Sequence, residues 1–177
     1  LSSSSAASDV YKRQRQRIEF LRRLTEDLFL AAKLEQKQIL LNEDRAALNE
    51  EAAAVCAACR SEADKKGVEL HVSADTPLPV WGDSVRLQQI IQNLVTNAIH
   101  YTPAGGSIHV DCRAEGETAC VSVQDTGCGI ENVEQARKPM FTTGDDSRSG
   151  MGFTIMESFT DRLRVRSAPG RGTVVTM

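Results

Sequence analysis

The stretch VWGDSVRLQQIIQNLVTNAIHY, residues 80–101, decides the fold. Its apolar residues recur with helical spacing, Asp83 can cap the helix, and Pro103 follows its end. Asn93 and Asn97 lie four residues apart and therefore share one side of the helix. Asparagine is a mediocre helix former, so the pair is either an oxygen-ligand set of the kind magnesium prefers or a solvated polar face.

Downstream, an alternating hairpin around Ile108–Cys112 and Ala119–Val123 leads into the turn Asp125-Thr-Gly-Cys-Gly129. Glycines adopt positive φ angles and let another group approach the backbone closely. A buried Asp can accept a hydrogen bond from an exocyclic amine such as that of adenine. The alternative is a tight turn with a capping Asp, because a lone D-x-G-x-G motif is a weak signal.

A second glycine segment, Arg148-Ser-Gly-Met-Gly152, opens another predicted helix after the polar residues 142–149. Backbone N–H groups at such a helix start favour phosphate oxygens, and the polar loop before it is suited to act as a lid. The final turn, residues 169–173, brings the Thr173 hydroxyl to the last predicted strand.

Upstream, residues 15–66 contain neither Gly nor Pro, which favours helices. An apolar stripe at spacings of three and four predicts an amphipathic helix with a partner: Ile18, Leu21, Leu24, Leu28, Ala31 and Leu34. We then expect a short strand at 38–41, a helix over 45–66 ended by Gly67, and a strand at 68–73.

We interpret residues 1–14 as a translated sequencing adapter or a disordered natural tail, and favour the adapter.

The composition excludes several classes of protein. A net charge of −3, a pI near 5.7 and 5% aromatic residues argue against a nucleic-acid or membrane-surface binder. No apolar run approaches the roughly 20 residues of a membrane span, and Leu1–Ser8 has no signal-peptide character. Five cysteines without disulfide spacing favour the cytoplasm, and Cys56 and Cys59 fit core positions on an alanine-rich helix.

In combination, these motifs resemble the boxes of the GHKL ATP-binding superfamily over residues 38–177. The resemblance implies a two-layer α/β sandwich whose mixed sheet is covered on one face by helices, preceded by a dimerisation helix at 15–37. It also implies ATP and Mg²⁺ as cofactors. Residues 23–35 and 80–103 are similar to sensor histidine kinases. Residues 138–159 resemble the sporulation anti-sigma-factor serine kinases more closely.

The resemblance assigns roles to individual residues. Asn93 and Asn97 would approach magnesium and the phosphates, and Asp125 would bind the adenine amine. Asn93 and Arg148 are the candidate catalytic residues, with Arg148 reaching the γ-phosphate. The remaining candidate nucleotide-binding residues are His100, Tyr101, Gly127, Gly129, Ile130, Phe141, Gly150, Gly152 and Thr173.

Asn93 bears on the choice between the two relatives. In anti-sigma kinases and gyrase-type ATPases, a Glu one turn before the magnesium-binding Asn is the general base. An amide cannot usefully accept a proton at neutral pH, whereas a neutral histidine acceptor is already a nucleophile and needs less help from a base. We therefore favour a histidine kinase domain. The alternatives are an anti-sigma-like protein that binds a sigma factor or phosphorylates an antagonist's serine, and a GHKL hydrolase.

The chain lacks a histidine in the acceptor context of histidine kinases, because His71, His100 and His109 all lie elsewhere. The expected acceptor is a histidine outside this fragment. We expect a homodimer through residues 15–37 in the full-length protein, with a response regulator or a sigma factor as partner. The expected location is the cytoplasm, including the cytosolic part of a membrane-bound sensor.

Overall fold

A computed structural model describes residues 44–141 and 149–177, together with positions 10, 11, 14, 15, 17, 18, 21, 22, 24–26, 28–30, 32, 33, 36, 41 and 42. The chain divides into two compact units. One comprises Leu1–Ile39 and Gln135–Ile155, and the other comprises Leu40–Glu134 and Met156–Met177. The boundaries fall within two short helices, α4 (Val133–Ala136) and α5 (Gly152–Ser158).

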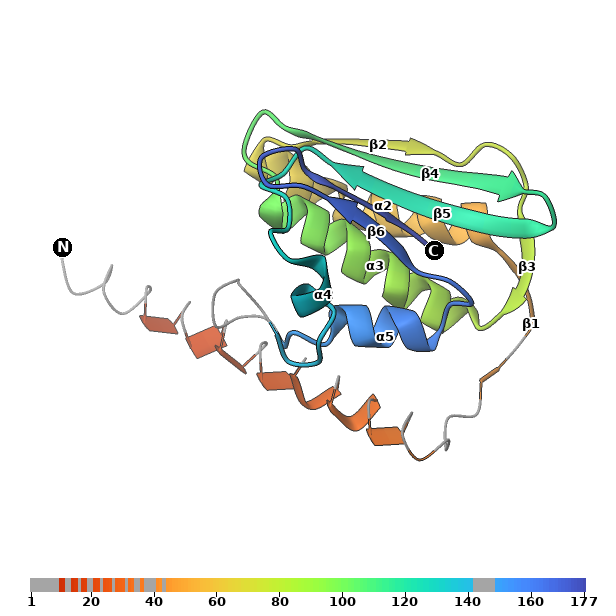
Figure 1. The fold of residues 1–177 in the computed structure, drawn as a ribbon, viewed down its shortest axis with the longest axis horizontal. Helices are drawn as coiled ribbons and strands as arrows, with labels where there is room; N and C mark the ends of the chain where they lie inside the picture. Colours follow the sequence, from red (N-terminus) through yellow and green to blue (C-terminus); the bar gives the residue numbers. More distant parts are fainter. Residues whose placement is uncertain are drawn as a thin grey trace. The chain divides into compact units, whose positions relative to one another are not determined.

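The larger unit is built on a five-stranded mixed sheet in the order β2-β4-β5-β7-β6 (Figure 1). β2 pairs parallel with β4, and the other neighbours are antiparallel. The strands are β2 (Glu69–Ser73), β4 (Ser107–Glu115), β5 (Thr118–Asp125), β6 (Arg164–Ser167) and β7 (Thr173–Thr176). The predicted α/β class with a mixed sheet is confirmed.

Two long helices, α2 (Leu48–Lys66) and α3 (Ser84–Tyr101), cover one face of this sheet (Figure 1). Asp83 caps α3 as predicted, because its carboxylate accepts from the backbone N–H groups of Val85 and Arg86 at 3.0 and 3.2 Å. Gly67 ends α2 in the left-handed conformation at φ 72°. The apolar sides of helices and strands form the core: Ile90, Ile91, Val95, Ile99, Ile108, Val110 and Val121 are almost fully buried.

The predicted start of α2 at residue 45 is wrong by three residues. Asp44–Ala47 instead forms β1, which pairs antiparallel with β3 (Pro79–Gly82) in a separate two-stranded sheet. Two nearby prolines, Pro77 and Pro79, predict a loop here from the sequence alone, yet Pro79 begins β3. Proline is tolerated at the first position of a strand, where its missing N–H breaks no ladder.

Cys56 and Cys59 lie in the core, as the sequence predicted. Burial, followed by the neighbouring thiols, raises the pKa of Cys56 to about 11, and burial also raises the pKa of Cys59. Among the described residues, no group of three His, Cys, Asp or Glu side chains could hold a metal. The two thiols are therefore protonated packing groups at neutral pH.

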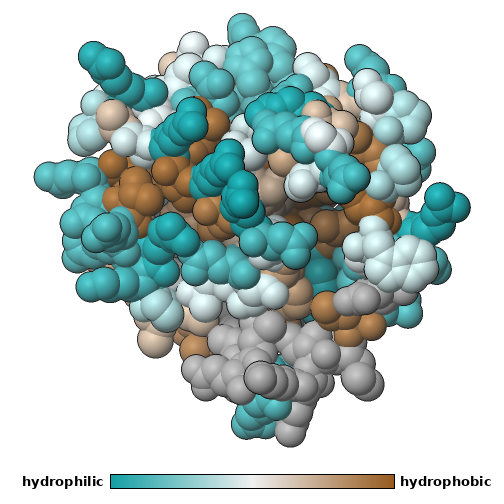
Figure 2. Space-filling model, turned by 45° about the vertical axis from the view of Figure 1, so that its right-hand side comes forward, coloured by the Kyte–Doolittle hydropathy of each residue, from teal (hydrophilic) through white to brown (hydrophobic). Residues whose placement is uncertain are grey.

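The other face of the sheet is polar. His71 and His109 stack there with ring centroids 4.7 Å apart, and Asp111 accepts from Arg113 at 2.6 Å. Figure 2 shows a surface on which hydrophilic side chains interrupt smaller hydrophobic areas. Alternation of buried and exposed residues along β4 and β5 produces this two-sided sheet.

In the smaller unit, the described positions between 10 and 33 are helical, in agreement with the predicted helix. Ile18, Leu21 and Leu28 of the apolar stripe are exposed. Ala31 and Leu34 lie outside the described residues, as do residues 1–9, the predicted strand positions 38–40 and most of the predicted lid at 142–148. Within the described part of the chain, no helix is long and apolar enough to span a membrane.

Candidate functional site

The carboxyl end of α3 and the turn after β5 meet through their backbones. The amide of Cys128 donates to the Tyr101 carbonyl at 3.3 Å. A Cβ on Gly127 would lie 2.7 Å from that carbonyl oxygen, so only glycine fits there without a shift. The fold thus places Tyr101, and the polar side of α3 behind it, next to the D-x-G-x-G turn.

Asp125 lies at the end of β5, on the helix-covered face of the sheet. Its carboxylate accepts from the Gly127 amide at 2.8 Å, and its strand partner across the ladder is Thr173. Burial raises the pKa of Asp125, while hydrogen bonds from the Gly127 and Thr173 backbones oppose that rise. One carboxylate oxygen is therefore held by the turn, and the group retains acceptor capacity toward a ligand amine.

Ser167 organises the neighbouring hydroxyl groups, although the sequence analysis did not select it. Its Oγ donates to the Gly172 carbonyl at 2.9 Å and accepts from the Ile130 amide at 2.7 Å. The Thr173 hydroxyl lies 2.9 Å from the same atom. Since the serine has one proton and Gly172 uses it, Thr173 donates to Ser167 and keeps its lone pairs for another donor. The sequence could not have predicted this role, because no motif indicates that a serine and a threonine will lie opposite each other on adjacent strands.

Asn93 and Asn97 are half-buried on the polar side of α3, between the buried apolar positions of the same helix. Tyr101 continues this row one turn further, and its ring meets that of His100 edge to face at 4.8 Å. α3 contains no Asp or Glu between Ser84 and Tyr101. The Asn93 and Asn97 amides are thus the side-chain oxygen ligands that this helix could offer to a metal near Tyr101.

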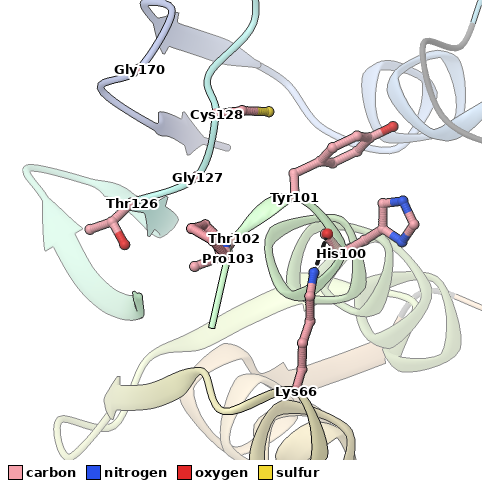
Figure 3. A pocket seen from close by; sticks show the side chains of 9 residues that line it. All are labelled: Lys66, His100, Tyr101, Thr102, Pro103, Thr126, Gly127, Cys128 and Gly170. Carbon is pink, nitrogen blue, oxygen red and sulfur yellow. Dashed lines mark hydrogen bonds between the residues drawn. The ribbon is translucent and has the colours of Figure 1, made fainter. Parts of the chain in front are cut away.

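An open pocket of about 400 Å³ lies at the end of α3 (Figure 3). In the view of Figure 3, the side chains of His100, Tyr101 and Cys128 point to the same side, and Lys66 donates to the carbonyls of Ile99, at 2.8 Å, and of His100. The lining residues are Lys66, His100, Tyr101, Thr102, Pro103, Thr126, Gly127, Cys128 and Gly170. The pocket therefore borders only part of the predicted site and does not include Asn93, Asn97 or Thr173.

The second glycine segment belongs to the smaller unit. Gly150 has φ 68°, and a Cβ there would lie 2.6 Å from the Met140 carbonyl carbon and 2.8 Å from the Phe141 nitrogen. Gly150 is thus brought against Phe141, and Gly152 begins α5. α5 has only seven residues, and the phosphate contacts expected of Gly150 and Gly152 stay a prediction. Arg148 lies outside the described residues.

The larger unit thus holds all of the predicted site residues before α4, together with Thr173. His100 and Tyr101 end α3, Asn93 and Asn97 lie up to about two turns before that end, and the other five lie at the end of β5, in the turn after it and on β7: Asp125, Gly127, Gly129, Ile130 and Thr173. A half-buried carboxylate acceptor, a threonine hydroxyl and two half-buried amides form a donor and acceptor set that fits an aminopurine and, beside it, a hydrated hard cation.

A family model described as "Histidine kinase-, DNA gyrase B-, and HSP90-like ATPase" matches residues 82–177. This chain belongs to that family. The match begins at the residue before Asp83 and extends to the end of β7, so it contains every site residue named above.

Two sequence relatives are anti-sigma F factors. The protein from Anoxybacillus flavithermus is 39% identical over 103 residues, which are 56% of this chain and 70% of that protein. The protein from Clostridium acetobutylicum is 42% identical over 94 residues, or 51% of this chain and 66% of that protein.

Similar solved structures include a histidine kinase and a complex with AMPPNP. Acinetobacter baumannii histidine kinase AdeS has a TM-score of 0.75 at 23% identity, covering 94% of this chain and 81% of AdeS. Full-length ShkA in complex with AMPPNP has a TM-score of 0.81 at 21% identity, covering 99% of this chain and 38% of ShkA. At these identities, the likeness shows the fold.

Proposed function

We propose that this domain binds Mg-ATP and transfers its γ-phosphoryl group to a histidine that another protein segment supplies. Membership of the ATPase family supports ATP as the substrate, and ShkA, a structural neighbour, was solved with an ATP analogue. In this proposal Asp125 and Thr173 recognise adenine, Tyr101 lies along the base, and Asn93 and Asn97 hold the magnesium that neutralises the phosphates.

One observation favours a histidine over a serine as the phosphoryl acceptor. α3 has an amide, Asn93, one turn before Asn97, and no carboxylate anywhere along its length. A serine hydroxyl must lose its proton as it attacks, so its phosphorylation benefits from a nearby carboxylate base. A neutral imidazole is already nucleophilic at neutral pH. An active site whose α3 carries only amides therefore suits a histidine acceptor.

The acceptor and the partners follow from the same proposal. Residues 15–37 would pair with a second helix in a homodimeric four-helix bundle. A response regulator would then receive the phosphoryl group. Since ATP is the substrate, the domain would act in the cytoplasm.

A second candidate has specific support. The two named relatives by sequence, at 39% and 42% identity, are anti-sigma F factors, whereas the histidine kinases resemble the chain mainly in fold. The chain would then bind a sigma factor or phosphorylate a serine of an antagonist protein. Asn93 weighs against the serine kinase activity and not against the binding.

Labelled ATP separates the two candidates. The chain is incubated with a dimerisation helix that carries an acceptor histidine, or with a serine-bearing antagonist of an anti-sigma factor. We expect an acid-labile, base-stable label on the helix and none on the chain alone. An acid-stable label on the antagonist, or tight binding of a sigma factor without transfer, would overturn the histidine kinase proposal in favour of the second candidate.

A further inference from the structure

β6 is an edge strand with an unusual concentration of positive charge. It is the last strand in the sheet order, and β7 is its one ladder partner among the described residues (Figure 1). Arg164 and Arg166 are exposed on it, and Arg162 and Arg171 are exposed just before and just after it. This cluster lies on a chain whose net charge is −3.

The register places Arg164 and Arg166 on the polar face of the sheet. Arg164 lies opposite Thr176, and Arg166 lies opposite Val174. The alternate residues of β6, Val165 and Ser167, lie opposite Val175 and Thr173 and belong to the helix-covered side. The two arginines therefore project from one side of the edge at a spacing of two residues.

The neighbouring strands do little to neutralise these arginines. Beyond Val174 and Thr176, the next residues across the ladder are Gln124 and Ser122, which are uncharged. Glu115 interacts electrostatically with Arg164, but its carboxylate is hydrogen-bonded to Arg113 at 2.8 and 3.1 Å. Within the described residues, no ion pair at 4.0 Å or closer involves the four arginines of this cluster.

We propose that the edge of β6 is a docking site for an extended acidic segment of a partner protein, which adds to the sheet as a sixth strand beside β6. Residues directly opposite each other on adjacent strands lie about 5 Å apart at Cβ. Carboxylates at every second residue of the added strand would therefore meet Arg164 and Arg166. The residues between them would lie beside Val165 and Ser167, so small or β-branched side chains fit there.

Two features favour a protein segment over a nucleic acid. An edge strand offers alternating backbone N–H and C=O groups, which another peptide backbone satisfies and a sugar-phosphate chain does not. The excess of 24 acidic over 21 basic residues also repels a long polyanion, whereas a short acidic strand contacts only this edge. Arg164 and Arg166 are not among the predicted nucleotide-binding residues, and they lie on the opposite side of β6 from Ser167, which contacts Thr173.

A simpler role for the arginines is protection. Like charges on an edge strand discourage two copies of a protein from pairing edge to edge. That role predicts no affinity for an acidic strand, so a binding experiment distinguishes the two.

The test uses a fluorescein-labelled peptide of alternating Glu and Val and measures its binding to the full chain by anisotropy. A peptide of alternating Gln and Val is the control. Arg164→Gln with Arg166→Gln should weaken binding of the Glu peptide by roughly fivefold to thirtyfold, as expected for two surface ion pairs, and added salt should weaken it further. Arg60→Gln with Lys65→Gln, an equal loss of two positive charges at exposed positions of α2, should leave binding within about twofold of the parent.

Backbone pairing is tested with two peptides that are N-methylated at complementary alternate residues, since only one set of amides would face β6. We expect one methylated peptide to lose binding and the other to keep it. The proposal is overturned if the Glu and Gln peptides bind equally, if the double variant binds like the parent, if neither methylation set matters, or if no binding occurs at millimolar peptide.

Asp125→Asn should leave peptide binding unchanged, and the double arginine variant should leave ATP binding unchanged. This inference and the proposed function can therefore fail separately.

Discussion

The glycines of the larger unit and those of the smaller unit have different structural roles. In the larger unit, a Cβ on Gly129 would lie 2.0 Å from the Ala168 carbonyl oxygen, and a Cβ on Gly172 would lie 1.9 Å from that of Asp125. These contacts join segments some 40 residues apart. In the smaller unit, Gly150 meets Met140 and Phe141, only about ten residues upstream. The first set of glycines therefore closes the tertiary fold, and the second shapes a local segment.

This comparison changes the meaning of the D-x-G-x-G motif. Glycine in such a turn is usually explained by close approach of a ligand. Here the groups that approach these glycines belong to the protein itself. They are the Asp125 carboxylate and the Tyr101 carbonyl at Gly127, and backbone atoms at Gly129 and Gly172. The glycines are thus explained by folding alone, and the evidence for a ligand rests on Asp125, Thr173 and the amides of α3.

The largest expected effect is that of Gly172→Ala. The new methyl group would overlap the Asp125 carbonyl at a φ of 76°, so we expect a loss of about 3 kcal/mol or more in the free energy of unfolding. Gly170→Ala is the matched control, because Gly170 has φ 72° in the same hairpin with nothing within 4 Å of the added Cβ. Its loss should be about 1 kcal/mol, from the backbone conformation alone. Equal losses in urea unfolding would contradict the packing argument.

Gly150→Ala should have a smaller effect on global unfolding. Its overlap is with the adjacent Met140–Phe141 backbone, so local rearrangement can relieve it, and we expect a loss of about 1–2 kcal/mol. Hydrogen exchange should show faster opening near residues 140–155 and unchanged protection in β5 and α3. A loss as large as that of Gly172→Ala would remove the distinction between the two segments.

Ser167→Ala tests the hydroxyl network that supports the first turn. The variant leaves the Ile130 amide and the Gly172 carbonyl without their side-chain partner, so we expect a loss of about 1–2 kcal/mol. Ser122→Ala is the control on the polar face of the sheet, where a hydroxyl pair of 3.1 Å joins β5 to β7. It should cost less than about 0.5 kcal/mol. Similar losses for both variants would show that Ser167 has no special role.

The smallest effect concerns pH. Because burial raises the folded-state pKa of Asp125, the folded protein holds that proton more tightly than the unfolded chain. The contribution of the Asp125 proton to the free energy of unfolding is complete below the ordinary pKa of 3.8. It is lost as pH rises through the folded-state pKa. Asp125→Asn should flatten this part of the stability profile, measured by thermal unfolding between pH 4 and 7. A parent protein whose Asp125-dependent stability increased with pH would contradict the direction of the shift.

The sequence predicted the helix and strands around the candidate site because their signals are local. A capping Asp, a helix-breaking Pro and the four-residue spacing of Asn93 and Asn97 determine α3 without reference to the rest of the chain. Alternation of apolar residues likewise determined β4 and β5.

The features that the sequence did not predict depend on distant partners. The β1–β3 pair joins residues separated by about 35 positions, and Pro79 suggested a loop. Ser167 gains its role only because the register brings it beside Thr173 and Ile130. The exposed edge of β6 follows from the strand order, which no local pattern encodes.

The most direct test of the account is to measure nucleotide binding by the parent and by Asp125→Asn. Titration calorimetry gives the affinity for Mg-ATP, and competition with GTP gives the base selectivity. The asparagine keeps an oxygen for the Gly127 amide, so the turn should survive. If Asp125 recognises the adenine amine, ATP affinity should fall by roughly ten- to hundredfold, and GTP should compete poorly with ATP in the parent. ATP affinity unchanged in the variant, or GTP competing as well as ATP, would contradict the assignment of this turn as the adenine site.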